Sequence, residues 1–82
     1  MDYVLLTKTI IEMLAQDKEA VSVNEYETED ENLIQIEVMV AESDLGTIIG
    51  KNGKTISSIR NIVGASALLN DGKKIKINVD SY

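Results

Sequence analysis

The sequence predicts an α+β domain in which three helices cover one face of a three-stranded mixed sheet, in the order helix, strand, strand, helix, helix, strand. Three observations indicate this fold. Apolar residues recur every three or four positions in three segments. They alternate with polar residues in three other segments. At 82 residues, the chain is near the lower size for a domain that folds without disulfides or metals, so we expect one domain over residues 1–82.

The first helix is predicted to begin after Asp2, whose carboxylate can cap it. Its apolar side chains share a three- and four-residue spacing and continue to about Gln16. They are Tyr3, Leu6, Ile10, Met13 and Leu14. A polar turn at residues 17–19 follows.

Two strands joined by a hairpin are predicted next. Val21 and Val23 alternate with polar residues in a strand that continues toward Thr28, and an acidic stretch at residues 29–32 forms the hairpin tip. The clearest alternation runs from residue 33 to residue 41, with Ile34, Ile36, Val38 and Val40 on one face. Because a short hairpin joins the two strands, they run antiparallel.

Two helices and a strand complete the chain. Ser43 is expected to cap a short helix, which the glycines of residues 50–53 end. The apolar positions of the next helix, which ends before the turn at residues 70–72, are Ile56, Ile59, Ile62 or Val63, and Ala67. The last strand, residues 73–79, turns Ile75, Ile77 and Val79 inward. Two helices between the second and third strands indicate a right-handed parallel crossover, which makes the sheet mixed.

Composition argues against an enzyme. The chain has no Cys and no His, which removes disulfides, the usual transition-metal ligands and nucleophiles that need an imidazole. A P-loop has four residues between its glycines and Ser or Thr after the Lys, whereas here three residues separate Gly46 from Gly50 and Asn52 follows Lys51. We therefore expect no catalytic residues, metal, cofactor or small-molecule substrate. No apolar run or secretory signal appears, so a cytoplasmic protein without membrane contact is expected.

The charge is divided unevenly along the chain. A net charge of −6 argues at first against a nucleic-acid partner. However, residues 1–44 hold 12 of the 14 acidic and 2 of the 8 basic residues, a net −10, and residues 45–82 hold a net +4. Since exposed charges are screened over about 8 Å in physiological salt, a basic surface can act on an acidic protein.

The segment Gly50-Lys51-Asn52-Gly53 carries the strongest functional signal. Two glycines between helices allow a sharp turn with positive φ and a close approach of ligand to backbone. Amides at the start of the following helix carry partial positive charge, and Lys51 and Lys54 flank them. Such a loop favours phosphate oxygens and does not distinguish bases.

The segment from Ile48 to Ile56 resembles the core of a KH domain: two aliphatic residues, Gly, two variable residues, Gly, and an aliphatic residue three positions later. The element order is that of the type II, or prokaryotic, KH domain. Residues 17–25, 40–46, 49–54 and 72–77 are moreover similar to the small bacterial single-KH proteins of the KhpA family.

This resemblance implies that single-stranded RNA of about four nucleotides lies in a groove between the two helices and the sheet. The clamp on its backbone would be Gly50, Lys51, Asn52 and Gly53. Around it, Ile49 and Ile56 would form an apolar floor beneath the bases, Lys54 and Arg60 would contact phosphates, and Gly46 would permit close approach. The resemblance also implies a homodimer or a heterodimer with a larger KH-containing protein, and a role as an RNA chaperone or post-transcriptional regulator linked to cell elongation and division.

Several of these residues also have purely structural interpretations. Ile49 and Ile56 are more often core residues than contacts for bases, and Arg60 fits an exposed surface charge equally well. Tyr26 could stack on a base, but packing is favoured on a peripheral strand. At the level of the whole chain, the alternative is a KH-fold protein–protein interaction module without RNA binding. The acidic first half favours it, and Lys51 and Asn52 disfavour it because acids there would repel phosphate.

Overall fold

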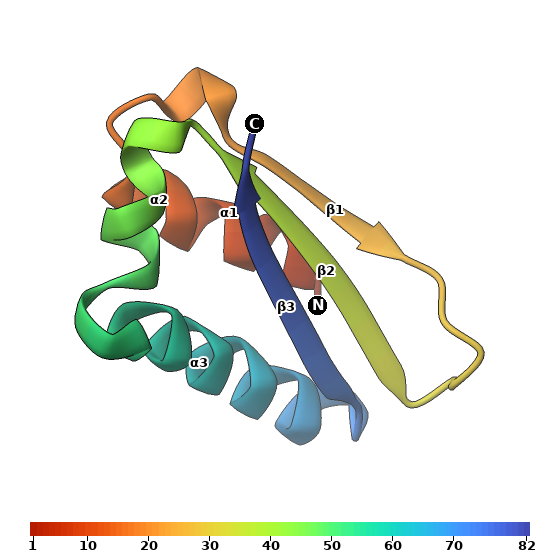
Figure 1. Cartoon of the computed structure of the whole chain (residues 1–82). Helices are drawn as coiled ribbons and strands as arrows, with labels where there is room; N and C mark the ends of the chain where they lie inside the picture. Colours follow the sequence, from red (N-terminus) through yellow and green to blue (C-terminus); the bar gives the residue numbers. More distant parts are fainter.

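The computed structural model describes all 82 residues and has three helices packed on one face of a three-stranded sheet (Figure 1). The elements in chain order are α1 (Tyr3–Leu14), β1 (Ser22–Tyr26), β2 (Leu33–Val40), α2 (Glu42–Ile49), α3 (Lys54–Asp71) and β3 (Lys74–Ser81). Short 3-10 turns are η1 (Lys18–Ala20) and η2 (Lys51–Gly53). In the sheet, β2 is central, antiparallel to β1 and parallel to β3. The predicted α+β fold with a mixed sheet is confirmed.

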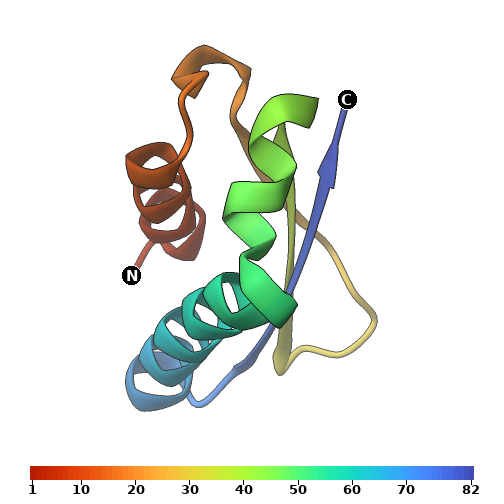
Figure 2. The same ribbon diagram turned by 60° about the vertical axis from the view of Figure 1, so that its left-hand side comes forward.

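The core lies between β2 and the helices. Alternate residues of β2 are buried as predicted, and Ile36, Val38 and Val40 are wholly inaccessible to solvent. They belong to one apolar cluster with residues of all three helices, including Ile11 of α1, Ile48 of α2 and Ile59, Val63 and Ala67 of α3. The helices lie on one side of the sheet, and its other face is left uncovered (Figure 2).

The buried stripe of α1 differs from the prediction. The residues turned inward are four apart: Tyr3, Thr7, Ile11 and Ala15. Met13 is 77% exposed and Leu14 38% exposed, so their predicted burial is wrong. Leu6 and Ile10 of the predicted stripe are half-buried against the core. The helix contacts β1, α2 and α3.

Both ends of α1 are capped by side chains. The Asp2 carboxylate accepts a hydrogen bond from the Leu5 amide at 3.0 Å, as predicted. The helix ends at Leu14, earlier than expected, with Ala15 in an extended conformation. Lys18 Nζ donates to the carbonyls of Glu12 and Ala15, the latter at 2.8 Å. A lysine at this end satisfies free carbonyls and stabilises the negative pole of the helix.

The start of α2 corrects a second prediction, because Ala41 and not Ser43 is the N-cap. The Asp44 amide donates to the Ala41 carbonyl at 2.9 Å, and no side chain caps the helix. Asp44, in the first turn of α2, faces inward and is only 3% exposed. Its carboxylate accepts hydrogen bonds from the amides of Gln16 and Asp17 at 3.1 and 3.0 Å. Asp44 therefore fastens α2 to the segment after α1.

Of the two alternatives predicted for α3, Val63 is buried in the core and Ile62 is 56% exposed. The helix continues through Asp71, past its predicted end, and stops at Gly72, which has a φ of 64°. Lys74 and not Lys73 begins β3, whose inward residue Ile77 is buried while Ile75 and Val79 are half-buried. The partial exposure is consistent with the position of β3 at the edge of the sheet.

A buried tyrosine connects the first helix, α1, to the last helix, α3. The Tyr3 hydroxyl donates a hydrogen bond to the Asp71 carboxylate, which connects the start of α1 to the end of α3. This hydrogen bond, burial and the negative charge of Asp71 together raise the pKa of Tyr3 from 10.0 to about 12. The folded protein therefore holds the phenolic proton more tightly than the unfolded chain does.

We expect this contact to make stability depend on alkaline pH. Since the folded-state pKa is the higher one, the contribution of Tyr3 is fully present below pH 10 and is lost as the pH rises through about 12. Urea unfolding of the parent and of Tyr3→Phe, compared across this range, should show a steeper loss for the parent. If the free energy of unfolding of the two proteins fell in parallel with pH, the raised pKa of Tyr3 would be contradicted.

Candidate nucleic-acid interface

The bend between α2 and α3 is built from three residues with positive φ. These residues are Gly50 (78°), Asn52 (56°) and Gly53 (73°). The Gly50 amide donates to the Gly46 carbonyl at 2.9 Å and closes α2, and the Gly53 amide donates to the Gly50 carbonyl at 3.1 Å. The chain thus turns sharply from α2 into α3 within one 3-10 turn whose shape is set by the backbone.

The two glycines of the bend are required for different reasons. Gly50, with a φ of 78° and a ψ of 172°, lies in a region that is essentially limited to glycine. A Cβ there would lie 2.9 Å from the Thr55 amide nitrogen and would also collide with the Thr55 side chain. Gly53 is left-handed, but a Cβ there would meet nothing within 4 Å. Gly50 therefore lets the first turn of α3 pack against the bend, whereas Gly53 only supplies the turn.

The start of α3 has the features of an anion site. No side chain caps this helix, and none of the side-chain hydrogen bonds of the protein uses an amide of residues 51–54. The amides of Gly53 and Lys54 donate to the backbone carbonyls of Gly50 and Lys51, so these two amides already have partners within the bend. Lys51, Asn52 and Lys54 are exposed, and the first turn of the helix holds no acidic residue. The N-terminus of an 18-residue helix concentrates partial positive charge at this place. The bend can accept anionic oxygens without first releasing a side chain.

The predicted apolar floor is divided between the core and the surface. Ile56 is 4% exposed and belongs to the core cluster. Ile49 is half-buried against the same cluster and keeps part of its side chain at the surface. Of the two, only Ile49 therefore has a partly accessible side chain.

Arg60 and Gly46 lie away from the bend itself. Arg60 Nε donates to the Ile77 carbonyl at 3.0 Å, which connects α3 to β3. The side chain is exposed, so the other nitrogens of the guanidinium remain as donors on the outside. Gly46 is exposed on α2, and a Cβ there would meet nothing within 4 Å, so any close approach there involves a ligand and not a neighbouring element.

Thr55 and Asp44 support the site and were not identified from the sequence. Thr55 packs against Gly50, and Asp44 fixes the start of the helix that leads to the bend. A carboxylate in the first turn of a helix is commonly an exposed partner of the helix dipole. Its burial depends on contacts 27 and 28 residues away along the chain, which local patterns do not reveal.

No group of three or more acidic residues is arranged to hold a metal ion. None of the helices combines the length and the apolar character needed to cross a bilayer.

Two helices joined by a glycine bend and packed on a mixed three-stranded sheet, in this element order, define a type II KH domain. A family model described as KhpA/KhpB, KH domain, matches residues 5–79. The chain belongs to this KhpA/KhpB family.

Relatives from several bacteria agree with this assignment. The chain is 43% identical over 63 residues to the RNA-binding protein KhpA of Caldanaerobacter subterraneus subsp. tengcongensis, covering 77% of this chain and 81% of that protein. It is 36% identical over 74 residues to the RNA-binding protein KhpA of Thermotoga maritima, covering 90% and 93%. Both relatives are named as RNA-binding proteins and the family is defined by a KH domain, which agrees with the expectation of a binding protein and not an enzyme.

A solved structure shares the fold. The crystal structure of Era in complex with MgGDPNP and nucleotides 1506-1542 of 16S ribosomal RNA matches with a TM-score of 0.66 and 19% identity. The match covers 96% of this chain and 29% of that chain. At this level of identity the likeness concerns the fold alone.

Proposed function

We propose that the chain binds single-stranded RNA and that the bend of residues 50–53 holds its sugar–phosphate backbone. The observation that carries this proposal is the uncapped start of α3 beside a left-handed glycine bend, with exposed Lys51 and Lys54 next to it. Backbone amides at a helix N-terminus are a ready site for phosphate. The names of the KhpA relatives support the same ligand.

The proposed mode of binding is a clamp on phosphates with little selection of bases. Gly50 and Gly53 keep the bend free of side chains, and Lys51 adds positive charge. The bases would rest on the exposed part of Ile49. None of the three tyrosines is part of the bend, and Tyr3 is buried. Because aromatic stacking supplies much of the affinity for single strands, we expect modest affinity and little sequence preference.

Arg60 extends the proposed phosphate path along α3. Its Nε is already bound to the Ile77 carbonyl, which fixes the guanidinium beside β3. The RNA would then run from the bend along the two helices, past Lys54 and Arg60 on α3 and Gly46 on α2. The hydrogen bond to β3 reduces the freedom that Arg60 would otherwise lose on binding phosphate.

The salt dependence of RNA binding tests this clamp. If two to four phosphates are contacted, log K should fall with log salt concentration at a slope of roughly −1.4 to −2.8 for single-stranded RNA. Fluorescence anisotropy with a labelled oligouridine, repeated over a series of KCl concentrations, measures the slope. Binding that persists with a slope near zero is incompatible with the backbone clamp.

We also propose that the chain self-associates or pairs with a larger KH-containing protein, as its family resemblance implies. In support, α3 exposes three large apolar side chains, Ile62 (56%), Leu68 (61%) and Leu69 (84%), whose burial against a partner would be favourable. Sedimentation velocity of the pure chain tests the homodimer. A monomer at every micromolar concentration would contradict it.

The cellular role that we propose is that of an RNA chaperone or post-transcriptional regulator linked to cell elongation and division. Family membership supports this role. Expression of the chain in a bacterium that lacks its own KhpA should restore normal cell length. Failure of a stably expressed chain to do so would argue against the role.

A further inference from the structure

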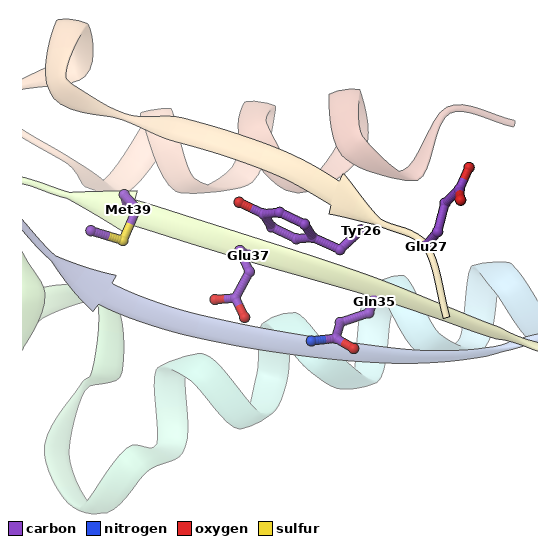
Figure 3. Close-up of a pocket in the computed structure, with 5 residues that line it drawn as sticks. All are labelled: Tyr26, Glu27, Gln35, Glu37 and Met39. Carbon is purple, nitrogen blue, oxygen red and sulfur yellow. The ribbon is translucent and has the colours of Figure 1, made fainter. Parts of the chain in front are cut away.

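A hollow of about 410 Å³ lies on the face of the sheet that no helix covers (Figure 3). The side chains that line it come from the end of β1 and from β2: Tyr26, Glu27, Gln35, Glu37 and Met39. Figure 3 shows the Tyr26 ring lying along the strands, with Met39 toward one end and Glu27 toward the other. The bend of residues 50–53 belongs to the helix layer, so the hollow and the RNA site are separate.

The hollow is shaped for an extended chain. Gln35, Glu37 and Met39 are alternate residues of β2 and point to the same face. Their spacing along the strand covers about 13 Å, the length of about four extended residues. Tyr26 of β1 pairs with Gln35 in the register, and its side chain lines the hollow on the β1 side. A short peptide lying along the strands would therefore contact all of these side chains.

The lining favours a cation. It holds two carboxylates, those of Glu27 and Glu37, and no basic side chain. Glu37 Oε1 accepts a hydrogen bond from the neutral Asn78 amide at 3.1 Å, which orients the carboxylate without neutralising it. Tyr26 is 51% exposed, so its ring is not used for packing in the core. An aromatic ring next to a carboxylate suits a planar guanidinium, which can stack on the ring and bind the carboxylate.

We propose that this hollow docks an extended, arginine-bearing segment of another protein, with the guanidinium between the Tyr26 ring and the Glu37 carboxylate. The β3 neighbours of Gln35, Glu37 and Met39 in the register are Lys76, Asn78 and Asp80, which together add no net charge. The negative charge of the hollow therefore comes from its own carboxylates, Glu27 and Glu37, and such a field attracts basic segments. The domain could then hold RNA on its helix side and a basic protein on its sheet side at the same time.

A capped peptide is the direct probe. The ¹⁵N-labelled protein is titrated with the acetylated and amidated peptide Gly-Val-Arg-Val-Arg-Gly and, separately, with the same peptide carrying citrulline in place of arginine. We expect amide shifts confined to β1 and β2, together with shifts of the Tyr26 ring protons, from the arginine peptide only. Citrulline keeps the shape of the side chain but has no charge.

Two variants and a matched control locate the binding. Tyr26→Ala and Glu37→Gln should each weaken the arginine peptide about 3- to 10-fold, since each removes one side of the guanidinium site. The control Glu31→Gln removes the same charge from the hairpin tip and should change affinity less than about 2-fold because exposed charges are screened. Thermal unfolding confirms that each variant is folded.

Three results would overturn the proposal. The citrulline peptide could bind as well as the arginine peptide, or Glu31→Gln could weaken binding as much as Glu37→Gln. Alternatively, single-stranded RNA could shift the amides of Tyr26 and Gln35 while the arginine peptide leaves them unmoved. The last result would assign the face to nucleic acid, with Lys76, the register neighbour of Gln35 on β3, as its phosphate contact.

Discussion

Replacing Lys51 and Asn52 together by aspartate is expected to weaken single-stranded RNA binding by about 100-fold. The change removes one positive charge and adds two negative charges at the place where phosphate is proposed to bind. Losing one charged hydrogen bond costs about 1.5 to 3 kcal/mol, and about 1.4 kcal/mol corresponds to a tenfold change in affinity. Crosslinking or filter retention of a labelled oligonucleotide measures the loss.

The fold should survive this double substitution. Both residues are exposed, and aspartate tolerates the left-handed conformation that Asn52 adopts with a φ of 56°. Negative charge at the start of α3 is also favourable to the helix dipole. We therefore expect the free energy of unfolding to change by less than about 0.5 kcal/mol.

A matched control separates local charge from total charge. Lys8→Asp combined with Asn24→Asp makes the same change in net charge at two exposed residues outside the bend, and it should leave most RNA affinity intact. A folded Lys51→Asp/Asn52→Asp protein that binds RNA as the parent does would instead favour the alternative of a protein–protein interaction module.

Replacing Gly50 by alanine is expected to destabilise the domain by about 3 kcal/mol or more. The residue occupies a backbone region reserved for glycine, which costs about 1 to 3 kcal/mol for other residues. In addition, the new Cβ would lie 2.9 Å from the Thr55 amide nitrogen, so α3 would have to move. The bend would lose its shape, and RNA binding should fall with it. Urea unfolding gives the change in stability.

Gly53→Ala is the matched control for Gly50→Ala. This residue is left-handed with a φ of 73°, but the space around a Cβ is open. The expected cost is therefore the left-handed conformation alone, about 1 to 2 kcal/mol. Equal losses from the two substitutions would show that the contact between Gly50 and Thr55 contributes nothing to the bend.

The sheet and the bend were predictable because their signals are local. Alternation over residues 33–41 identified the inward residues of β2 correctly, and every one of them is buried. Gly50 and Gly53 marked a turn between two helices, which the positive φ values bear out. Period and glycine placement are properties of a few consecutive residues, so the sequence displays them directly.

Choices that depend on neighbouring elements were not predictable. Ile62 and Val63 both fit the helical spacing from Ile59, and only packing against the sheet selects Val63. On α1, Met13 and Leu14 fit the apolar pattern, but the polar Thr7 occupies the buried line. Periodicity gives the presence of a buried face more reliably than its exact direction.

Long-range hydrogen bonds were equally hidden. Asp44 is buried because it binds the amides of Gln16 and Asp17, and Arg60 reaches the carbonyl of Ile77. Neither bond is apparent from the sequence, which predicts Arg60 as a phosphate contact or an exposed surface charge and predicts no role for Asp44. Their partners become neighbours only when the crossover from β2 to β3 has brought the helices onto the sheet.

The most direct measurement is an NMR titration of the ¹⁵N-labelled protein with a short single-stranded oligouridine. If the bend clamps phosphates, the amides of residues 51–55 should show the largest shifts, and those of the acidic hairpin at residues 29–32 should stay unchanged. RNA that binds while the amides of the bend remain unmoved would contradict the account.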